Sequence, residues 1–238
     1  MVLVPTYNER ENIGPVLDAI AREQPTFDVL VIDDASPDGT GALADARASD
    51  DARVHVLHRP GKQGLGRAYL DGFEWALASP RNYTHVFEMD ADLSHDPRYL
   101  GPLLAACRRG ADVALGSRYV PGGGVRNWGP HRRLLSRGGS VYARAVLGVS
   151  IRDLTGGFKC FARHVLEALP LREVFTVGYG FQIEMTYRAL CQGFEVVEVP
   201  IIFPDRVAGS SKMSMRIFWE GVTSVWKLRR ADLTGRRA

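Results

Sequence analysis

The sequence predicts an α/β fold, in which a mixed, mostly parallel sheet is flanked by helices on both faces. Two observations support this class. Up to residue 115, short apolar runs alternate with amphipathic stretches, an order typical of parallel strands joined by right-handed helical crossovers. The chain has 238 residues, of which 45% are hydrophobic and 24% charged, as in one ordinary globular domain. This composition excludes a disordered acidic tail, a collagen-like repeat and a polytopic membrane protein.

The elements of the first half follow from apolar spacing and from the residues that interrupt it. Strands are predicted where short apolar runs end in proline, acidic or polar residues: Val2–Pro5, Phe27–Asp33, Val54–His58, Tyr83–Met89 and Asp112–Leu115. Helices are predicted between them, where apolar residues recur every three or four positions: Glu9–Glu23, Gly41–Ala48, Gly64–Ala78 and Pro97–Arg109. The first helix shows the pattern at Ile13, Val16 and Ile20, and Pro25 lies beyond its end.

The regular order ends after Gly116. Pro121–Gly124 is too rich in glycine for the interior of an element and is predicted to be a loop. The later elements are predicted from the same signals: strands at Phe158–Phe161 and Glu195–Phe203, and helices at Leu134–Leu147, Gly180–Gln192 and Ile217–Leu228. Because no internal repeat or linker-like segment is seen, residues 1–215 are predicted to form a single domain, followed by an amphipathic, basic C-terminal segment at 216–238.

The cysteines and the lengths of the apolar segments indicate the cellular compartment of the protein. Cys107, Cys160 and Cys191 lie far apart and form no CxxC pair, which predicts a reducing compartment and no zinc site. No apolar run reaches about 18 residues, so we expect no transmembrane helix. The start, MVLVPTYNE, lacks the basic and long apolar regions of a signal peptide. These features predict a cytoplasmic protein.

Charge is distributed unevenly along the chain. The net charge of +3 is too small to indicate a nucleic-acid partner by itself. Residues 116–144 carry six basic residues and no acid, and residues 206–238 carry eight basic residues and two acids. The remainder is therefore acidic. This asymmetry indicates an anionic partner, either a phosphate-bearing ligand or an anionic membrane surface; solvated helix faces are the alternative.

Acidic residues follow three of the predicted strands. Asp33 and Asp34 end the second strand, Asp90 and Asp92 follow the fourth, and Glu9 follows the first. In open α/β sheets ligands bind at the carboxyl ends of the strands, where carboxylates repel one another unless a cation or a donor-rich ligand is present. Two carboxylates separated by one small residue can bind Mg²⁺ or Mn²⁺, with diphosphate oxygens completing the shell. Capping of the turns is the alternative role.

Several motifs occur together in a recognisable order: PTYNE (5–9), VIDDASPDGT (31–40), GLGRA (64–68), EMDADLSHDP (88–97), GSRYVPGGG (116–124), DLTGGFK (153–159) and DRVAGSSKM (205–213). In this combination the sequence resembles glycosyltransferase family 2, the inverting enzymes of GT-A fold. More narrowly, it is similar to the polyprenol-phosphate (dolichol-phosphate) mannose synthases. The resemblance extends from residue 3 to about residue 215.

The resemblance implies a donor site at the first three motifs. Pro5, Tyr7 and Glu9 match the segment that contacts the nucleotide, with a core tyrosine as the alternative for Tyr7. Ile32 and Asp34 match positions beside the base and the ribose. A carboxylate such as that of Asp34 can accept hydrogen bonds from guanine N–H groups or ribose hydroxyls.

The resemblance also implies a metal and nucleotide-sugar site at Asp90, Ala91 and Asp92, in which Asp90 and Asp92 ligate Mg²⁺ or Mn²⁺. Some relatives supply a third ligand from a glutamine two residues after the second aspartate, where this chain has Ser94. That departure leaves the rest of the coordination shell to water, phosphate or His95.

Catalysis is expected to depend on Asp92 and on three cations. Arg118 matches the arginine of the GSRY motif, and Arg206 and Lys212 match a flexible loop that closes over the phosphates in relatives. Departure of GDP places negative charge on the diphosphate, and fixed cations stabilise that charge more in the transition state than in the ground state.

The acceptor implied by the resemblance is a phosphate monoester, largely dianionic at neutral pH because its second pKa is near 6. Such a nucleophile needs positioning but no strong general base, so none is assigned. Arg132, Arg133 and Arg137 are candidates for binding its phosphate. Asp153, Gln182 and Glu184 are candidates for contacts with mannose hydroxyls. Equally, Asp153 could fix a loop and Glu184 could pair with a nearby cation.

These features predict an enzyme that transfers mannose from GDP-mannose to a polyprenyl phosphate with inversion. There are two alternatives. The donor could be another nucleotide sugar such as UDP-glucose, or the chain could be a non-catalytic nucleotide-sugar-binding subunit that activates a membrane partner. The predicted location is the cytoplasmic face of a membrane, where a membrane-embedded partner protein could also take part. The basic amphipathic stretch at residues 217–230 either lies on the membrane surface or packs against the core.

Overall fold

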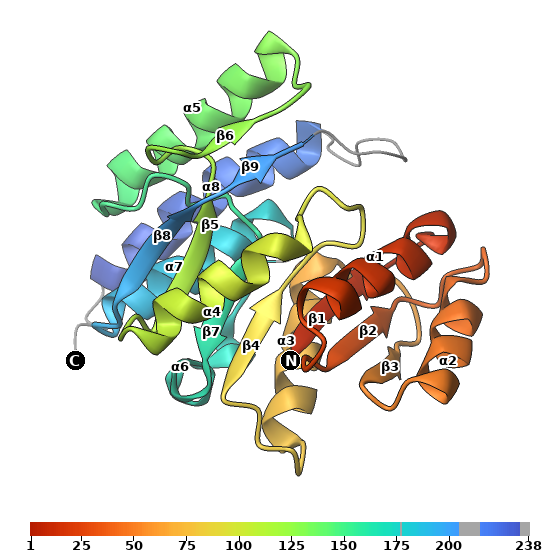
Figure 1. Cartoon of the computed structure of the whole chain (residues 1–238). Coiled ribbons are helices and arrows are strands. Elements are labelled where there is room, and N and C mark those ends of the chain that lie inside the picture. Colours follow the sequence, from red (N-terminus) through yellow and green to blue (C-terminus); the bar gives the residue numbers. More distant parts are fainter. Residues whose placement is uncertain (177, 205–214, 234–238) are drawn as a thin grey trace.

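The computed structural model describes residues 1–176, 178–204 and 215–233 (Figure 1). The strands are β1 (Val2–Thr6), β2 (Val29–Asp33), β3 (Val54–His58), β4 (His85–Glu88), β5 (Val113–Ser117), β6 (Gly124–Val125), β7 (Lys159–Ala162), β8 (Val196–Pro200) and β9 (Ile202–Phe203). The α-helices are α1 (Arg10–Glu23), α2 (Thr40–Asp50), α3 (Leu65–Ala78), α4 (Leu100–Arg108), α5 (Pro130–Leu147), α6 (Arg163–Ala168), α7 (Tyr179–Cys191) and α8 (Met215–Leu233).

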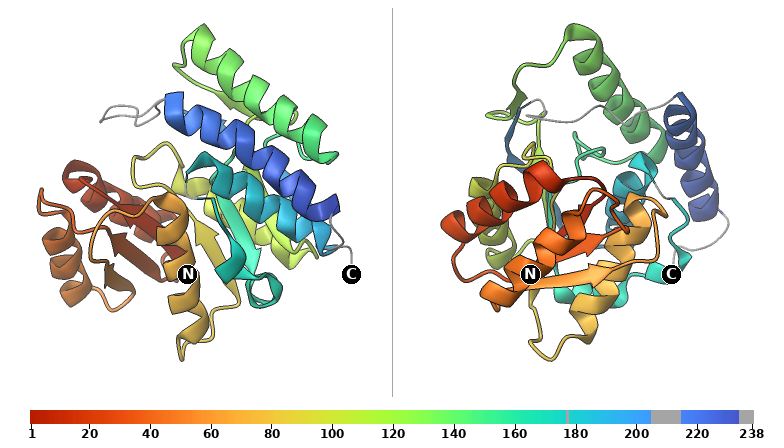
Figure 2. Two further views of the ribbon diagram at one scale, coloured as in Figure 1. Left: turned by 180° about the vertical axis from the view of Figure 1, so that it is seen from behind. Right: turned by 90° about the vertical axis from the view of Figure 1, so that its right-hand side faces the viewer.

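The sheet has the strand order β3-β2-β1-β4-β7-β5-β8, and helices cover both of its faces (Figure 2). Alternate residues of a strand point to opposite faces. Val2 and Val4 therefore join one apolar cluster with α1 and α4, whereas Leu3 joins a second cluster with α3 and α7. The predicted mixed, mostly parallel sheet between two helical layers is confirmed.

Strand β7 is the antiparallel member of this sheet. It pairs antiparallel with both β4 and β5, whereas β1 pairs parallel with β2 and β4, and β5 pairs parallel with β8. Lys159, the first residue of β7, lies opposite Glu88 at the end of β4 and also opposite Leu115 of β5. The segment that precedes β7 therefore reaches the same edge as the residues that follow β4 and β5.

Several boundaries differ from the sequence prediction. The strand expected at Glu195–Phe203 is two strands, because the chain leaves the main sheet after Pro200 and β9 pairs with the short β6 instead. Helix α5 begins at Pro130, where proline suits the first helical turn, rather than at Leu134. The short β6 and α6 lie in segments whose patterns are too brief to predict.

Helices α5 and α8 form an outer layer beside α7 (Figures 1 and 2). A third apolar cluster joins Ala143 and Leu147 of α5, Ile183 of α7, and Val225 and Leu228 of α8. In addition, the Tyr142 hydroxyl donates to the carbonyl oxygen of residue 222 at 3.1 Å. One face of the C-terminal helix is thus packed on the domain, as in the second of the two alternatives. Within the described part of the chain, we find no helix with the length and apolarity required to cross a bilayer.

Candidate active site

The ends of β1, β2 and β4 lie side by side at one edge of the sheet, as the sequence predicted. Thr6 is in register with Asp33, and Leu3 with Glu88. After each strand the chain passes through a left-handed residue that is not glycine: Asn8 (φ 58°), Ala35 (φ 54°) and Leu93 (φ 59°). For residues such as Ala35 and Leu93 this conformation costs roughly 1–2 kcal/mol, whereas asparagine adopts it more readily, and strain of this kind is often found at functional sites.

The two adjacent acids after β2 have different roles. Asp33 fixes the turn, because its carboxylate accepts hydrogen bonds from the Ser36 amide at 3.1 Å and from the Thr6 hydroxyl at 3.2 Å. Asp34 instead pairs with the buried guanidinium of Arg59, which also donates to Asp71 at 2.8 Å. Burial raises the pKa of Asp34, although the adjacent guanidinium opposes the shift. Arg59 therefore fixes the orientation of the carboxylate predicted to contact the nucleotide, a role the sequence analysis missed.

The remaining residues of the predicted nucleotide segment have separate contacts. Tyr7 is half-buried, and the Lys62 ammonium lies 4.2 Å from its ring centroid. Glu9 accepts a hydrogen bond from the Asn12 amide at 2.8 Å. Ile32, opposite Pro5 in the sheet, is fully buried in the cluster with α3. Any contact between Ile32 and a ligand would consequently involve its backbone.

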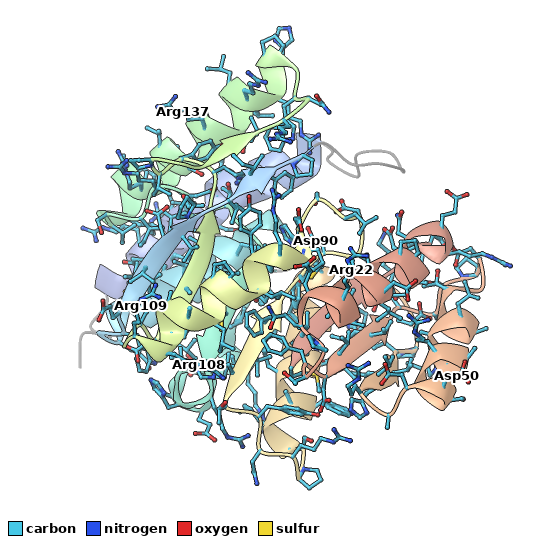
Figure 3. The ribbon with its side chains drawn as sticks, in the orientation of Figure 1. Arg22, Asp50, Asp90, Arg108, Arg109 and Arg137 are labelled. Carbon is cyan, nitrogen blue, oxygen red and sulfur yellow. The ribbon has the colours of Figure 1, made fainter. Side chains whose placement is uncertain are left out.

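Asp90 lies on the loop after β4, near the centre of the molecule in Figure 3. Its side chain is 32% exposed, its Oδ1 lies 3.4 Å from the Tyr69 hydroxyl, and its Oδ2 lies 3.9 Å from His95 Nε2. His95 is buried, accepts a hydrogen bond at Nδ1 from the Asp90 amide at 2.9 Å and stacks on Phe158 at 4.8 Å. The imidazole of His95 thus packs in the core and supports the loop of Asp90. This structural role differs from the metal-ligand role considered in the sequence analysis.

Asp92 is buried and closes the same loop. Its Oδ1 accepts hydrogen bonds from both the amide and the hydroxyl of Ser94. Ser94, at the position where some relatives have glutamine, therefore orients the second carboxylate. Ala91 between the two aspartates is also buried. Two carboxylates fit Mg²⁺ or Mn²⁺, because these ions are often bound by one or two protein carboxylates together with substrate phosphates and water. Among the described residues, no group of three or more His, Cys, Asp or Glu side chains could hold a metal.

Arg118 and Asp153 form a buried, bidentate ion pair at the end of β5. Arg118 Nε donates to Asp153 Oδ2 at 2.7 Å and Nη2 to Oδ1 at 2.6 Å, and the Arg118 amide also donates to Oδ2. A hydrogen bond from Arg118 to the Thr155 hydroxyl at 2.9 Å adds a further restraint. In this conformation Asp153 fixes both a loop and the predicted phosphate-binding arginine, which agrees with the alternative role for Asp153.

Glu198 of β8 holds the loop that contains Asp153, and the sequence analysis did not single it out. Its carboxylate accepts hydrogen bonds from the Arg152 amide at 2.8 Å, the Asp153 amide at 3.0 Å and the Ser117 hydroxyl at 2.7 Å. An acid within a strand gives no sequence signal for this role, because the loop lies 45 residues away in the chain.

A buried ionic group lies beneath the loop of Asp90. Glu88 and Lys159 are fully buried, with Lys159 Nζ 3.7 Å from Glu88 Oε2. Lys159 also donates to the Gln182 backbone carbonyl at 2.9 Å and to its side-chain Oε1. Burial raises the pKa of Glu88 to about 7 and lowers the pKa of Lys159. Gln182, a candidate sugar contact, is thus buried and joined to this pair.

The basic residues predicted to bind the acceptor phosphate lie on α5. Arg132 is half-buried, with its guanidinium carbon 4.0 Å from the Trp128 ring centroid, whereas Arg133 is exposed. Figure 3 shows Arg137 further along the same outer helix. The predicted flap residues Arg206 and Lys212 lie outside the described residues.

Comparisons with known proteins identify the family of this chain. The profile described as "Glycosyl transferase family 2" matches residues 1–169, and the chain belongs to this family. It is 53% identical over 215 residues to a polyprenol monophosphomannose synthase of Mycolicibacterium smegmatis, a match covering 90% of this chain and 80% of the relative. It is also 48% identical over 225 residues to an undecaprenyl-phosphate mannosyltransferase of Micrococcus luteus, covering 94% and 91%.

A similar fold is seen in mannosyl-3-phosphoglycerate synthase from Rubrobacter xylanophilus, with a TM-score of 0.66 and 19% identity over 99% of this chain and 74% of that one. The TarS 1–349 structure of S. aureus in complex with UDP-GlcNAc has a TM-score of 0.63 at 18% identity, covering 98% of this chain and 66% of that one. At these identities, the likeness concerns the fold alone.

Proposed function

We propose that this protein transfers mannose from GDP-mannose to a polyprenyl phosphate with inversion at the anomeric carbon. The observation that carries the proposal is the antiparallel β7, whose register brings the Asp153 loop to the same sheet edge as Asp90, Asp92 and Arg118. The names of the two relatives, at 53% and 48% identity, support mannose as the sugar and a polyprenyl phosphate as the acceptor.

In the proposed reaction, an acceptor phosphate oxygen forms a bond to C1 of mannose. The bond from C1 to the β-phosphate oxygen breaks, and its electron pair leaves with GDP. No proton has to be removed from the dianionic acceptor, because the second pKa of a phosphate monoester is near 6. The protein therefore has to position two anions and stabilise the charge on the leaving diphosphate.

Asp90 and Asp92 would hold Mg²⁺ or Mn²⁺, which when bound would neutralise the diphosphate charge. Asp34, held by Arg59, and the half-buried Tyr7 are positioned to contact the nucleoside. Arg118 would face the diphosphate or the acceptor phosphate while Asp153 fixes its guanidinium. Arg206 and Lys212, outside the described residues, are proposed to supply further positive charge to the phosphates.

Helix α5 supplies a surface suited to a lipid substrate. Its exposed residues include Leu134 (76%), Leu135 (42%) and Val141 (50%), and the exposed Arg133 and Arg137 lie on the same helix. Residues 134, 137 and 141 share one helix face. Apolar side chains beside cations are typical of helices that lie on anionic membranes. We therefore place the membrane-facing surface on α5 and the exposed side of α8, including Trp226 (51% exposed).

The reaction is tested with the full chain, Mg²⁺, labelled GDP-mannose or UDP-glucose, and a short polyprenyl phosphate. Label is expected in the lipid extract only when the labelled donor is GDP-mannose. Transfer from UDP-glucose instead would reassign the donor, and binding of GDP-mannose without turnover would favour a binding subunit. Asp92→Ala is expected to abolish transfer, whereas Asp50→Asn, which changes an exposed acid on α2 labelled in Figure 3, should leave it intact.

The membrane surface is tested by sedimentation with phosphatidylglycerol vesicles. Replacing both Leu134 and Leu135 with glutamate should weaken binding at least about tenfold, because two apolar contacts are lost and two negative charges are added. Leu43→Glu, an exposed leucine on α2, is the matched control. Equal binding by the α5 double variant and the control would contradict this placement.

A further inference from the structure

The segment that leads into α5 contains a buried tryptophan whose polar atom has no partner. Trp128 is 6% exposed, and its indole Nε1 is buried without a hydrogen-bond partner among the described residues. Buried N–H donors are nearly always paired, since an unpaired one loses its hydrogen bonds to water without replacement. An unpaired donor beside a substrate site indicates that a ligand supplies the acceptor.

The same indole contacts two of the arginines predicted to bind phosphate. The guanidinium carbon of Arg132 lies 4.0 Å from the Trp128 ring centroid, and that of Arg118 lies 5.6 Å from it. Phe203 packs edge-on against the ring with a centroid distance of 5.5 Å. Cations over an aromatic face are attracted by the ring quadrupole. Trp128 thus forms a rigid support between a residue of α5 and one at the end of β5.

The charge at the start of α5 points to an anion. The first turn of this helix contains His131, Arg132 and Arg133 and no acidic residue. The N-terminal end of a helix already carries a partial positive charge, and cations placed there add to a positive potential that favours an anion. This arrangement and the unpaired indole N–H are independent observations at the same place.

We propose that Trp128 is part of the phosphate site for the acceptor: its ring positions Arg132, and its Nε1–H donates to a phosphate oxygen. This inference deepens the proposed function and rests on it. The shared chemistry is a phosphate oxygen, which either the acceptor monoester or the donor diphosphate could provide. The proposal commits to the acceptor, because the cation nearest to the Trp128 ring is Arg132 of α5, a residue predicted to bind the acceptor phosphate.

The test compares Trp128→Phe, which keeps an aromatic ring but removes the N–H, with Trp128→Leu, which removes both. Trp75→Phe, a half-buried tryptophan of α3 that stacks on Tyr83, is the matched control. Steady-state kinetics with a short polyprenyl phosphate give the KM for the acceptor, and calorimetry with GDP-mannose gives the Kd for the donor. Thermal melting identifies any variant that fails to fold.

Loss of one hydrogen bond to a charged group corresponds to roughly a tenfold or greater change. Trp128→Phe is therefore expected to raise the acceptor KM about tenfold and to leave the donor Kd within about twofold of wild type. Trp128→Leu should raise the acceptor KM further, because Arg132 also loses its support.

An unchanged acceptor KM in a folded Trp128→Phe protein would overturn the proposal, as would an equal loss of donor affinity. A simple packing role would lower the melting temperature without separating the two substrates. If the wild-type protein transferred no mannose to polyprenyl phosphate, the proposed function itself would fail; if wild type is active and only the Trp128 result is negative, this inference alone fails.

Discussion

The buried pair formed by Lys159 and Glu88 gives the sharpest stability prediction. Both side chains are fully buried, and their charged atoms lie 3.7 Å apart. In Lys159→Met, Glu88 would lose its counter-charge in a place that water does not reach. Breaking a buried ion pair by removing one partner typically costs about 3–5 kcal/mol. The hydrogen bonds from Lys159 to the Gln182 carbonyl and side chain would be lost as well.

The loss of stability in Lys159→Met should depend on pH, because Glu88 is no longer an unpaired charge once it binds a proton. Burial raises its pKa from 4.5 to about 7 in the folded protein, so the folded state holds a proton that the unfolded state has released. Stability therefore falls as pH rises from about 4.5 through 7. A shift of this size corresponds to roughly 3 kcal/mol in wild type. Without Lys159, whose charge lowers the pKa of Glu88, the fall should be larger in total and extend to higher pH.

Urea denaturation at pH 5.5 and pH 8.0, in buffer with EDTA so that no divalent ion binds Asp90, measures this effect. Lys159→Met should lose about 3–5 kcal/mol at pH 8.0 and clearly less at pH 5.5. Replacing Glu88 with Met as well should restore much of the loss at pH 8.0. Lys227→Met, at an exposed position of α8, should change stability by no more than about 0.5 kcal/mol.

Two results would refute the reasoning: an equal loss for Lys159→Met at both pH values, or a double variant less stable at pH 8.0 than Lys159→Met alone. The first would mean that packing rather than an unpaired carboxylate sets the cost. The second would mean that the Glu88 carboxylate still stabilises the fold without Lys159, so that an unpaired buried charge is not the source of the loss.

Three further outcomes test the site. Asp92→Asn should reduce kcat at least about 100-fold while leaving the melting temperature nearly unchanged. The Mn²⁺ concentration needed for half-maximal activity should rise, because one metal ligand is weakened. Arg59→Met should raise the KM for GDP-mannose and lower stability by about 3 kcal/mol, because Asp34 is left buried without its partner; an unchanged KM would separate Asp34 from nucleotide binding. Glu198→Ala should lower kcat/KM through the released loop of Asp153, and Glu198→Gln should recover part of it, since an amide oxygen can still accept some of the hydrogen bonds.

The sequence by itself determined the layered architecture, the strand ends that carry the acids and the motifs that define the family. Apolar periodicity is local, so Val2 and Val4 on one face and Leu3 on the other can be assigned without the fold. Acids at strand ends could be predicted to meet because parallel strands finish at a common edge.

Only the tertiary structure decided which acids and cations face each other. The antiparallel direction of β7 has no local signature, yet it brings Asp153 beside Arg118 and Lys159 beside Glu88. Glu198 likewise gains its role from a loop 45 residues away, and Trp128 packs against Phe203 of β9. Pairing across a sheet depends on the packing energy of the whole domain rather than on neighbouring residues, and this is why the sequence located the edge of the site but not its internal contacts.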